Sequence, residues 1–238
     1  YIGIAQDEIE MLCGRYPIKS DALYCGPDRI AIKGQNHCFP AGNHDYPEAD
    51  EETRKAILEA HVDHMLGYFY FVQHDESIPE ETRVRNQQFG LDKTLYPDNN
   101  NIPYEIYVRE ARRIRGRYIF REQDATIAPG INRAPIHHDA IAIAEWPMDS
   151  HDCTTEIRAG SLHDGVLLLA EETRPSQVPF RTLLPRDLDN LLVPICLSAT
   201  HVGWGTLRVE PTWMHISESA AYAATLAVTN NLVVSNVP

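Results

Sequence analysis

The chain has 238 residues, and 43% of them are hydrophobic, which is enough to build a folded core. It carries 21 Lys and Arg against 34 Asp and Glu, a formal net charge of −13. Such a charge repels phosphate backbones, so the composition argues against a nucleic-acid partner. The longest apolar stretches fall short of the roughly 20 residues that cross a bilayer. We therefore expect a soluble protein without a membrane span.

The cysteines and the closest pair of helical histidines do not predict a metal site. The five cysteines are odd in number and widely spaced, with no C-x-x-C pair. This spacing argues against a disulfide framework and allows at most one bridge, among Cys13, Cys25 and Cys38. His61 and His64 have a spacing that places two ligands on one helix face, but no third ligand accompanies them. We favour a solvated or capping role for both, and predict no metal.

The first half of the chain predicts a hairpin and two helices. Residues 22–25 and 29–32 are typical of short strands, and the turn residues Gly26, Pro27 and Asp28 join them. Residues 53–73 predict a helix, because their apolar side chains recur at helical spacing. These side chains are Leu58, Val62, Met65, Leu66 and Phe69. A second helix is predicted over residues 104–115, ending at Gly116.

The second half predicts more strands. Residues 118–121, 141–144, 165–170 and 191–193 have strand composition, and the last of these is apolar enough to be buried. A long final helix is predicted from Pro211 to about Val228. Strands mixed with only a few helices predict a mixed α/β (α+β) architecture.

Residues 178–212 are the most informative stretch. They predict a buried strand, then a loop holding Ser198, Thr200 and His201, then the start of the final helix. A helix N-terminus offers free N–H groups to an anion or a polarised carbonyl, and Gly203 and Gly205 allow a ligand to approach the backbone. A tight strand-to-helix connection without a ligand explains the same residues, and spacing alone does not decide between these interpretations.

Three ordered motifs resemble one protein family. Residues 191–201 (LLVPICLSATH) with 205–211 (GTLRVEP) resemble the C-terminal signature of a bacterial family of FAD-dependent oxidoreductases. Residues 107–114 (YVREARRI) resemble the family's middle motif, and residues 148–151 (MDSH) resemble its Asp-x-His element. The resemblance runs in the same order from about Thr53 to Val228.

The resemblance implies a division into two domains. Residues 1–176 would form a substrate domain, and residues 177–238 would supply the strand, loop and helix that complete a Rossmann-type FAD domain. Members of the family open with a strand, a glycine-rich turn and a helix that hold the nucleotide. The only G-x-G of this chain, Gly203-Trp204-Gly205, lies late in the sequence and follows no such strand. The expected partner is therefore an N-terminal FAD-binding segment that is missing from these residues.

The resemblance also implies roles for individual residues. The dipole of the helix that begins near Pro211, helped by the charge of Arg208, would stabilise negative charge on the reduced flavin. The base that removes the substrate proton would be His201 or His151, with Asp149 orienting one of them. A role as an ordinary core or surface residue stays open for each histidine. The expected FAD-binding residues are Ser198, Thr200, Gly203, Gly205, Thr206, Arg208 and Thr212.

The expected substrate is a small molecule bound by Arg109, Arg113 and Trp204. The arginines between positions 109 and 121 suit an anionic sugar, although ion pairs with the chain's own carboxylates are the commoner explanation in an acidic protein. The leading hypothesis is an FAD-dependent oxidoreductase that transfers a hydride from a small, carbohydrate-related substrate to flavin. The alternative is a non-catalytic ligand-binding module that keeps the fold without the nucleotide-binding half.

Overall fold

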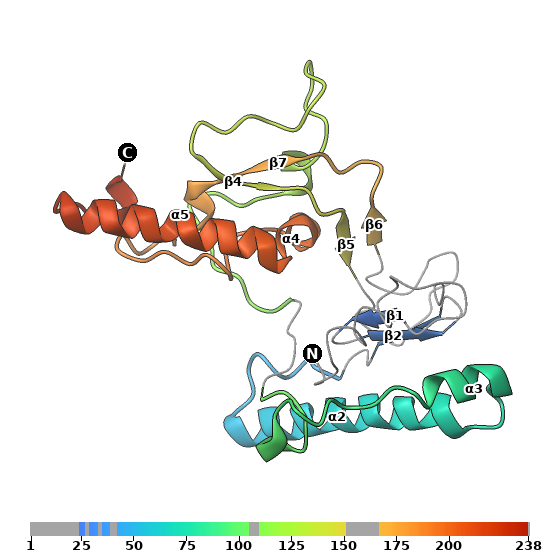
Figure 1. Ribbon diagram of the computed structural model, residues 1–238. Coiled ribbons are helices and arrows are strands. Elements are labelled where there is room, and N and C mark those ends of the chain that lie inside the picture. Colours follow the sequence, from blue (N-terminus) through green and yellow to red (C-terminus); the bar gives the residue numbers. More distant parts are fainter. Residues whose placement is uncertain are drawn as a thin grey trace. The chain divides into compact units, whose positions relative to one another are not determined.

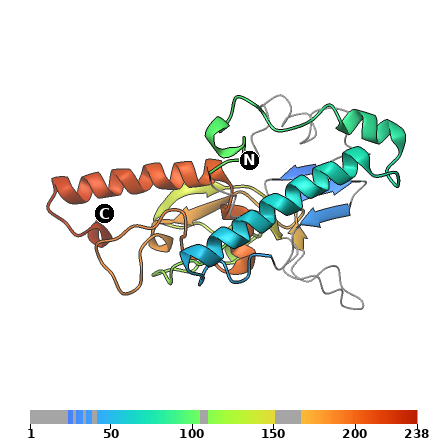
Figure 2. The same ribbon diagram turned by 90° about the horizontal axis from the view of Figure 1, so that it is seen from below.

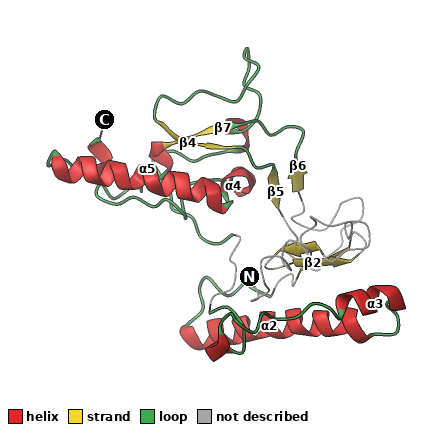
Figure 3. Cartoon of the chain, viewed as in Figure 1, coloured by secondary structure: helices red, strands yellow, loops and turns green. Residues whose placement is uncertain are grey.

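The computed structural model describes residues 42–104, 110–150 and 167–237, with the backbone of three short strands nearer the N-terminus (Figure 1). The chain divides into two compact units, Tyr1–Val108 and Arg109–Pro238. Helices mix with small sheets, as the sequence predicts for a mixed α/β fold (Figure 3). No helix within the described ranges is long and apolar enough to cross a membrane.

The N-terminal strands form one antiparallel sheet. Strands β1 (Tyr24–Gly26), β2 (Arg29–Ile32) and β3 (Gln35–Cys38) pair in the order β1-β2-β3. Gly26 lies opposite Arg29, so the predicted hairpin is confirmed, and β3 is a third strand that the sequence analysis does not include.

The predicted first helix is confirmed as α2 (Glu51–His74). The side chain of Asp50 caps it by accepting a hydrogen bond from the Thr53 N–H at 2.9 Å, and Glu51 and Glu52 lie in the first turn, where the helix dipole favours negative charge. Its buried residues recur at intervals of three and four: Met65, Tyr68, Phe69 and Val72. Helix α3 (Glu80–Asn86) follows Pro79 and packs beside the C-terminal end of α2 (Figures 1 and 2).

The second unit has two strand pairs and two helices. Strand β4 (Ala140–Ala144) pairs antiparallel with β7 (Ser176–Pro179), and β5 (Met148–Ser150) pairs antiparallel with β6 (Leu167–Leu169). Helix α4 (His201–Leu207) packs on β5, and α5 (Glu210–Thr229) packs on β4. Much of the remaining chain here is loop (Figure 3).

The core of this unit combines residues from loops, strands and both helices. Phe120, Met148, Leu197, Leu207 and Ile216 are wholly buried. Because β7 spans Ser176–Pro179 and pairs with β4, the predicted boundary at 176/177 falls inside a strand of one compact unit. The division into a substrate part and a flavin-closing part is a division by function, and it stays a prediction.

The structure corrects four predicted elements. Residues 110–115 are not helical, while 105–109 lie outside the described residues. Residues 191–193 are neither a strand nor buried, since Pro194 supplies no ladder donor and Leu191 is 43% exposed. Residues 118–121 make only an isolated bridge, between Phe120 and Ala199. The predicted loop through Gly203 and Gly205 is helix α4.

Candidate functional site

Helix α4 begins at the histidine singled out from the sequence. Thr200 caps the helix, and its hydroxyl accepts a hydrogen bond from the Gly203 N–H at 3.1 Å. The Thr200 N–H donates to the Phe120 carbonyl at 2.8 Å, which ties the cap to a buried segment. His201 is therefore the first residue of a short, firmly anchored helix, and its side chain is 44% exposed.

Both ring nitrogens of His201 contact polar side chains. Nδ1 lies 2.9 Å from Glu110 Oε1, and Nε2 lies 2.9 Å from the Ser150 hydroxyl. These partners are 91 and 51 positions away in the sequence. The carboxylate that contacts the His201 ring is that of Glu110. Neither Glu110 nor Ser150 was among the predicted site residues, because nothing in a linear pattern marks such distant partners.

The contact with Glu110 changes the titration of both groups. The hydrogen bond that His201 donates to Glu110 is the main reason that the pKa of His201 lies above its ordinary value of 6.5, and it outweighs burial and the charge of Arg113. Burial alone would raise the pKa of Glu110, but hydrogen bonds from His201 and Arg113, with their positive charges, leave that pKa lowered. The arrangement favours an ionised Glu110.

Arg113 is already engaged by the protein. Its guanidinium pairs with Glu110, its Nε donates to the Ala199 carbonyl at 3.0 Å, and its Cζ lies 5.5 Å from the centre of the Trp204 ring. Trp204 is only 4% exposed and stacks at a tilt on Trp213, with ring centres 5.8 Å apart. Little of either predicted substrate-binding side chain is open to a ligand.

Asp149 and Arg208 form a buried ion pair beneath α4. Arg208 Nε donates to Asp149 Oδ1 at 3.0 Å, and Trp146 Nε1 donates to the same oxygen at 3.3 Å. The Arg208 and Asp149 side chains are only 8% and 15% exposed. The Asp149 carboxylate therefore balances the Arg208 charge that the resemblance assigns to the flavin.

The two glycines of α4 serve close packing. A Cβ on Gly205 would lie 2.7 Å from the Asp149 backbone nitrogen and oxygen, and one on Gly203 would lie 2.7 Å from the Phe120 carbonyl oxygen. The space beside each glycine is filled by the chain's own backbone. This corrects the reason given from the sequence, which was close approach by a ligand.

Two polar side-chain atoms near the junction between α4 and α5 differ from the groups described above. The hydroxyl of Thr206 and Nε1 of Trp213 are buried without a hydrogen-bond partner in the part of the chain that the structure describes. Helix α5 receives no side-chain cap at Val209, and buried Thr212 lies in its first turn. Ser198, by contrast, is 1% exposed and lies in a buried loop segment beside Gly116.

Several of the predicted site residues and cysteines lie outside the described residues. Arg109 and His151 are outside the described residues, as are the side chains of Cys13, Cys25 and Cys38. Cys196 is free and exposed. Within the described ranges, no group of three His, Cys, Asp or Glu side chains is placed to hold a metal ion. Two arginines of the basic run pair with carboxylates of the chain, Arg113 with Glu110 and Arg117 with Asp189.

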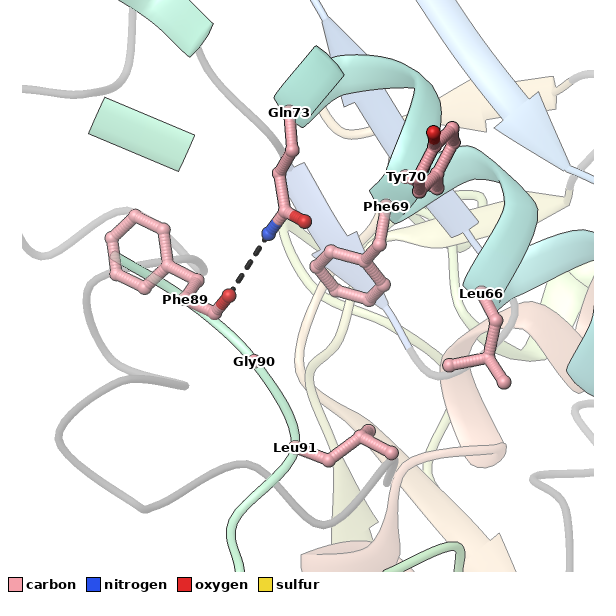
Figure 4. A pocket seen from close by; sticks show the side chains of 7 residues that line it. All are labelled: Leu66, Phe69, Tyr70, Gln73, Phe89, Gly90 and Leu91. Atoms are coloured by element: carbon pink, nitrogen blue, oxygen red, sulfur yellow. Dashed lines mark hydrogen bonds between the residues drawn. The ribbon is translucent and has the colours of Figure 1, made fainter. Parts of the chain in front are cut away.

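The N-terminal unit contains a small apolar cavity of about 240 Å³ (Figure 4). Its walls are the C-terminal half of α2 and the segment that follows α3. Gln73 closes one side by donating to the Asn86 and Phe89 carbonyls, both at 2.9 Å. The lining residues are Leu66, Phe69, Tyr70, Gln73, Phe89, Gly90 and Leu91.

Comparison with known families identifies the class of protein. Residues 18–238 match the model of the FAD dependent oxidoreductase family. Because the match spans most of the chain, the chain belongs to this family of flavin oxidoreductases. No curated protein and no solved structure matches it.

Proposed function

We propose that the chain serves an FAD-dependent oxidation in which a hydride passes from a small, carbohydrate-related substrate to the flavin, with His201 as the base. The observation that carries the proposal is the half-exposed imidazole of His201, held by Glu110 in a chain of this family. Bound FAD supplies the hydride acceptor. Family membership favours this function over a non-catalytic ligand-binding module.

The chain's part in the reaction is to take up a proton. Oxidation of an alcohol removes the hydroxyl proton as the C–H bond gives up its hydride, so the site needs a neutral imidazole beside the substrate. Because Glu110 raises the pKa of His201, the neutral base forms at a higher pH than in an ordinary histidine. His151 remains the second candidate, and Asp149 its possible orienting partner.

We propose that the α4–α5 junction faces the flavin. The N-terminal end of the α5 dipole favours negative charge, and the unpartnered Thr206 hydroxyl suits a ring carbonyl or nitrogen. Because the sequence carries no glycine-rich nucleotide fingerprint, we assign the ADP half of FAD to a separate N-terminal FAD-binding segment. Arg208 and Thr212 would then shape this junction, while Ser198, Thr200, Gly203 and Gly205 would hold α4 in place.

Thr206→Val tests the flavin site. Valine keeps the shape but removes a hydroxyl that lacks a partner, so the flavin-free protein should be as stable as wild type or more stable. FAD titration of the full native protein should show affinity weakened by about 3- to 10-fold, the loss of one hydrogen bond. Thr225→Val, which removes an exposed hydroxyl bonded to the Ala221 carbonyl, is the matched control. Equal affinities in the two variants, or no FAD binding at all, would refute the assignment.

His201→Ala tests the base. Flavin absorbance would be followed anaerobically after addition of glycerol, D-glucose or myo-inositol. Reduction should slow by about 10²-fold or more while FAD stays bound. His215→Ala, on the exposed side of α5, should reduce at the wild-type rate. An unchanged rate in His201→Ala would remove His201 from the mechanism and make His151 the next residue to test.

A further inference from the structure

Three side chains from distant parts of the second unit form one hydrogen-bonded series. Glu110 lies in a loop, Ser150 ends β5, and His201 begins α4. The two contacts, Glu110 Oε1 to Nδ1 and Ser150 Oγ to Nε2, are both 2.9 Å. Each ring nitrogen thus has its own partner, with the carboxylate at one end and the hydroxyl at the other.

The chemistry of the groups fixes where the protons lie. An ionised carboxylate only accepts hydrogen bonds, so Nδ1 of His201 carries a hydrogen. In the neutral imidazole Nε2 then holds the lone pair, and the Ser150 hydroxyl donates to it. When Nε2 takes up a proton, it becomes the donor and the serine oxygen the acceptor. General acid–base sites use the same order of groups: a hydroxyl that donates a proton, a base that accepts it, and a carboxylate that orients the base.

Glu110 is itself held in place. Arg113 pairs with it, and the Arg113 guanidinium is fixed in turn by the Ala199 carbonyl and the Trp204 ring. The charged groups that face His201 in the described residues are thus Glu110, which favours the imidazolium, and Arg113, which opposes it. Because Arg113 anchors it before any ligand binds, the carboxylate can act as a fixed orienting group.

We propose that Glu110 is a positioning residue that fixes the His201 tautomer, and that the Ser150 hydroxyl passes the substrate proton to Nε2. This proposal rests on the proposed function. As the substrate hydroxyl gives its proton to Ser150 Oγ, the serine gives its own to Nε2, and the imidazolium is paired with ionised Glu110. The substrate carbon loses its hydride to the flavin and becomes a carbonyl, so the substrate gives up one proton and one hydride in all.

The first test needs no flavin. In the full chain labelled with ¹⁵N-histidine, His201→Asn identifies the His201 signals in NMR spectra. The neutral ring should carry its hydrogen on Nδ1. Glu110→Gln still accepts from Nδ1 but loses the charge, so it should lower the pKa of His201, whereas the control Glu122→Gln, on an exposed residue, should leave it unchanged. A hydrogen on Nε2 in wild type, or the same pKa in Glu110→Gln, would overturn the positioning role.

The second test separates proton transfer from structure. In the pH profile of flavin reduction, Glu110→Gln should move the inflection to lower pH. Ser150→Ala should slow reduction by about 10²-fold, and Ser150→Thr, which keeps a hydroxyl, should restore most of the rate. A wild-type profile in Glu110→Gln, or a wild-type rate in Ser150→Ala, would overturn the proposal. If no alcohol reduces the flavin in the wild-type protein, the result counts against the proposed function. The positioning role of Glu110 is then decided by the NMR measurement of the His201 tautomer.

Discussion

Each of the two compact units has internal side-chain contacts of a different sequence range. In the N-terminal unit, Asp50 caps α2 from three residues away, and Gln73 bridges 13 and 16 positions to the segment after α3. In the C-terminal unit, Arg208 reaches Asp149 across 59 positions and His201 reaches Glu110 across 91. These contacts of the N-terminal helices span few residues, while the C-terminal unit depends on distant segments of backbone that pack closely. Its candidate chemistry lies at those meeting points.

Breaking the buried ion pair should give the largest effect. Arg208→Met leaves the Asp149 carboxylate buried without its cation, and removal of one partner of a buried pair costs about 3–5 kcal/mol. Trp146, Trp204 and Trp213 are the chain's three tryptophans, so fluorescence-detected urea unfolding follows the C-terminal unit. Adding Asp149→Ala should cost less than the sum of the single changes. A loss below about 1 kcal/mol would show that the pair is solvated rather than buried.

The same substitution at two glycines should have opposite effects. Gly205→Ala places a Cβ 2.7 Å from the Asp149 backbone, and such overpacking costs about 1–3 kcal/mol. In α2, nothing lies within 4 Å of a Cβ on Gly67, so Gly67→Ala should stabilise the helix by about 0.5–1 kcal/mol. Fluorescence reports the first change and far-ultraviolet circular dichroism the second. Equal effects at both sites would remove the contrast between the units.

The same contrast explains how far the sequence predicts the fold. Helix α2 was predicted within two residues at its start and one at its end, because its cap and apolar spacing are local. The strand prediction for residues 191–193 is wrong. An apolar run beside Pro194 resembles a strand in sequence, but whether it pairs with another strand depends on the rest of the chain. Helix α4 was missed because glycine disfavours helices, yet here Gly203 and Gly205 allow the helix to touch two backbones.

The candidate site was predicted less completely than the fold. His201 was chosen from a motif, and the structure gives it a defined environment. Glu110 and Ser150 lie within the motifs at residues 107–114 and 148–151, but no spacing rule connects positions 110, 150 and 201. Only the folded chain shows that Asp149 pairs with Arg208 while Glu110 contacts His201.

A substitution of Gln73 should affect the stability of the N-terminal unit only. Gln73→Met keeps the size of the side chain but removes the amide donor to the Asn86 and Phe89 carbonyls, at about 1–2 kcal/mol for the two bonds. The Asn86 carbonyl keeps the Phe89 N–H as a second donor. Circular dichroism should show the loss, while Gln88→Met, on an exposed residue, should show none. A matching loss in tryptophan fluorescence would mean that the two units unfold together and would break the comparison.

The smallest effect is a pH dependence of the C-terminal unit. The lowered pKa of Glu110 stabilises the fold above its ordinary value of 4.5, and this contribution is lost as pH falls through the folded pKa. The raised pKa of His201 stabilises the fold below 6.5, and this contribution is lost as pH rises through the folded pKa. The advantage of wild type over Glu110→Gln should therefore peak between 4.5 and 6.5.

That advantage should stay below about 1 kcal/mol, because solvent screens the half-exposed His201 ring. Urea unfolding followed by tryptophan fluorescence at several pH values measures it, with Glu122→Gln as the control for loss of one negative charge. Glu122→Gln should show no peak. A difference between wild type and Glu110→Gln that is constant across this range would mean that the two side chains meet as neutral groups, and the C-terminal unit would then hold its base by packing rather than by charge.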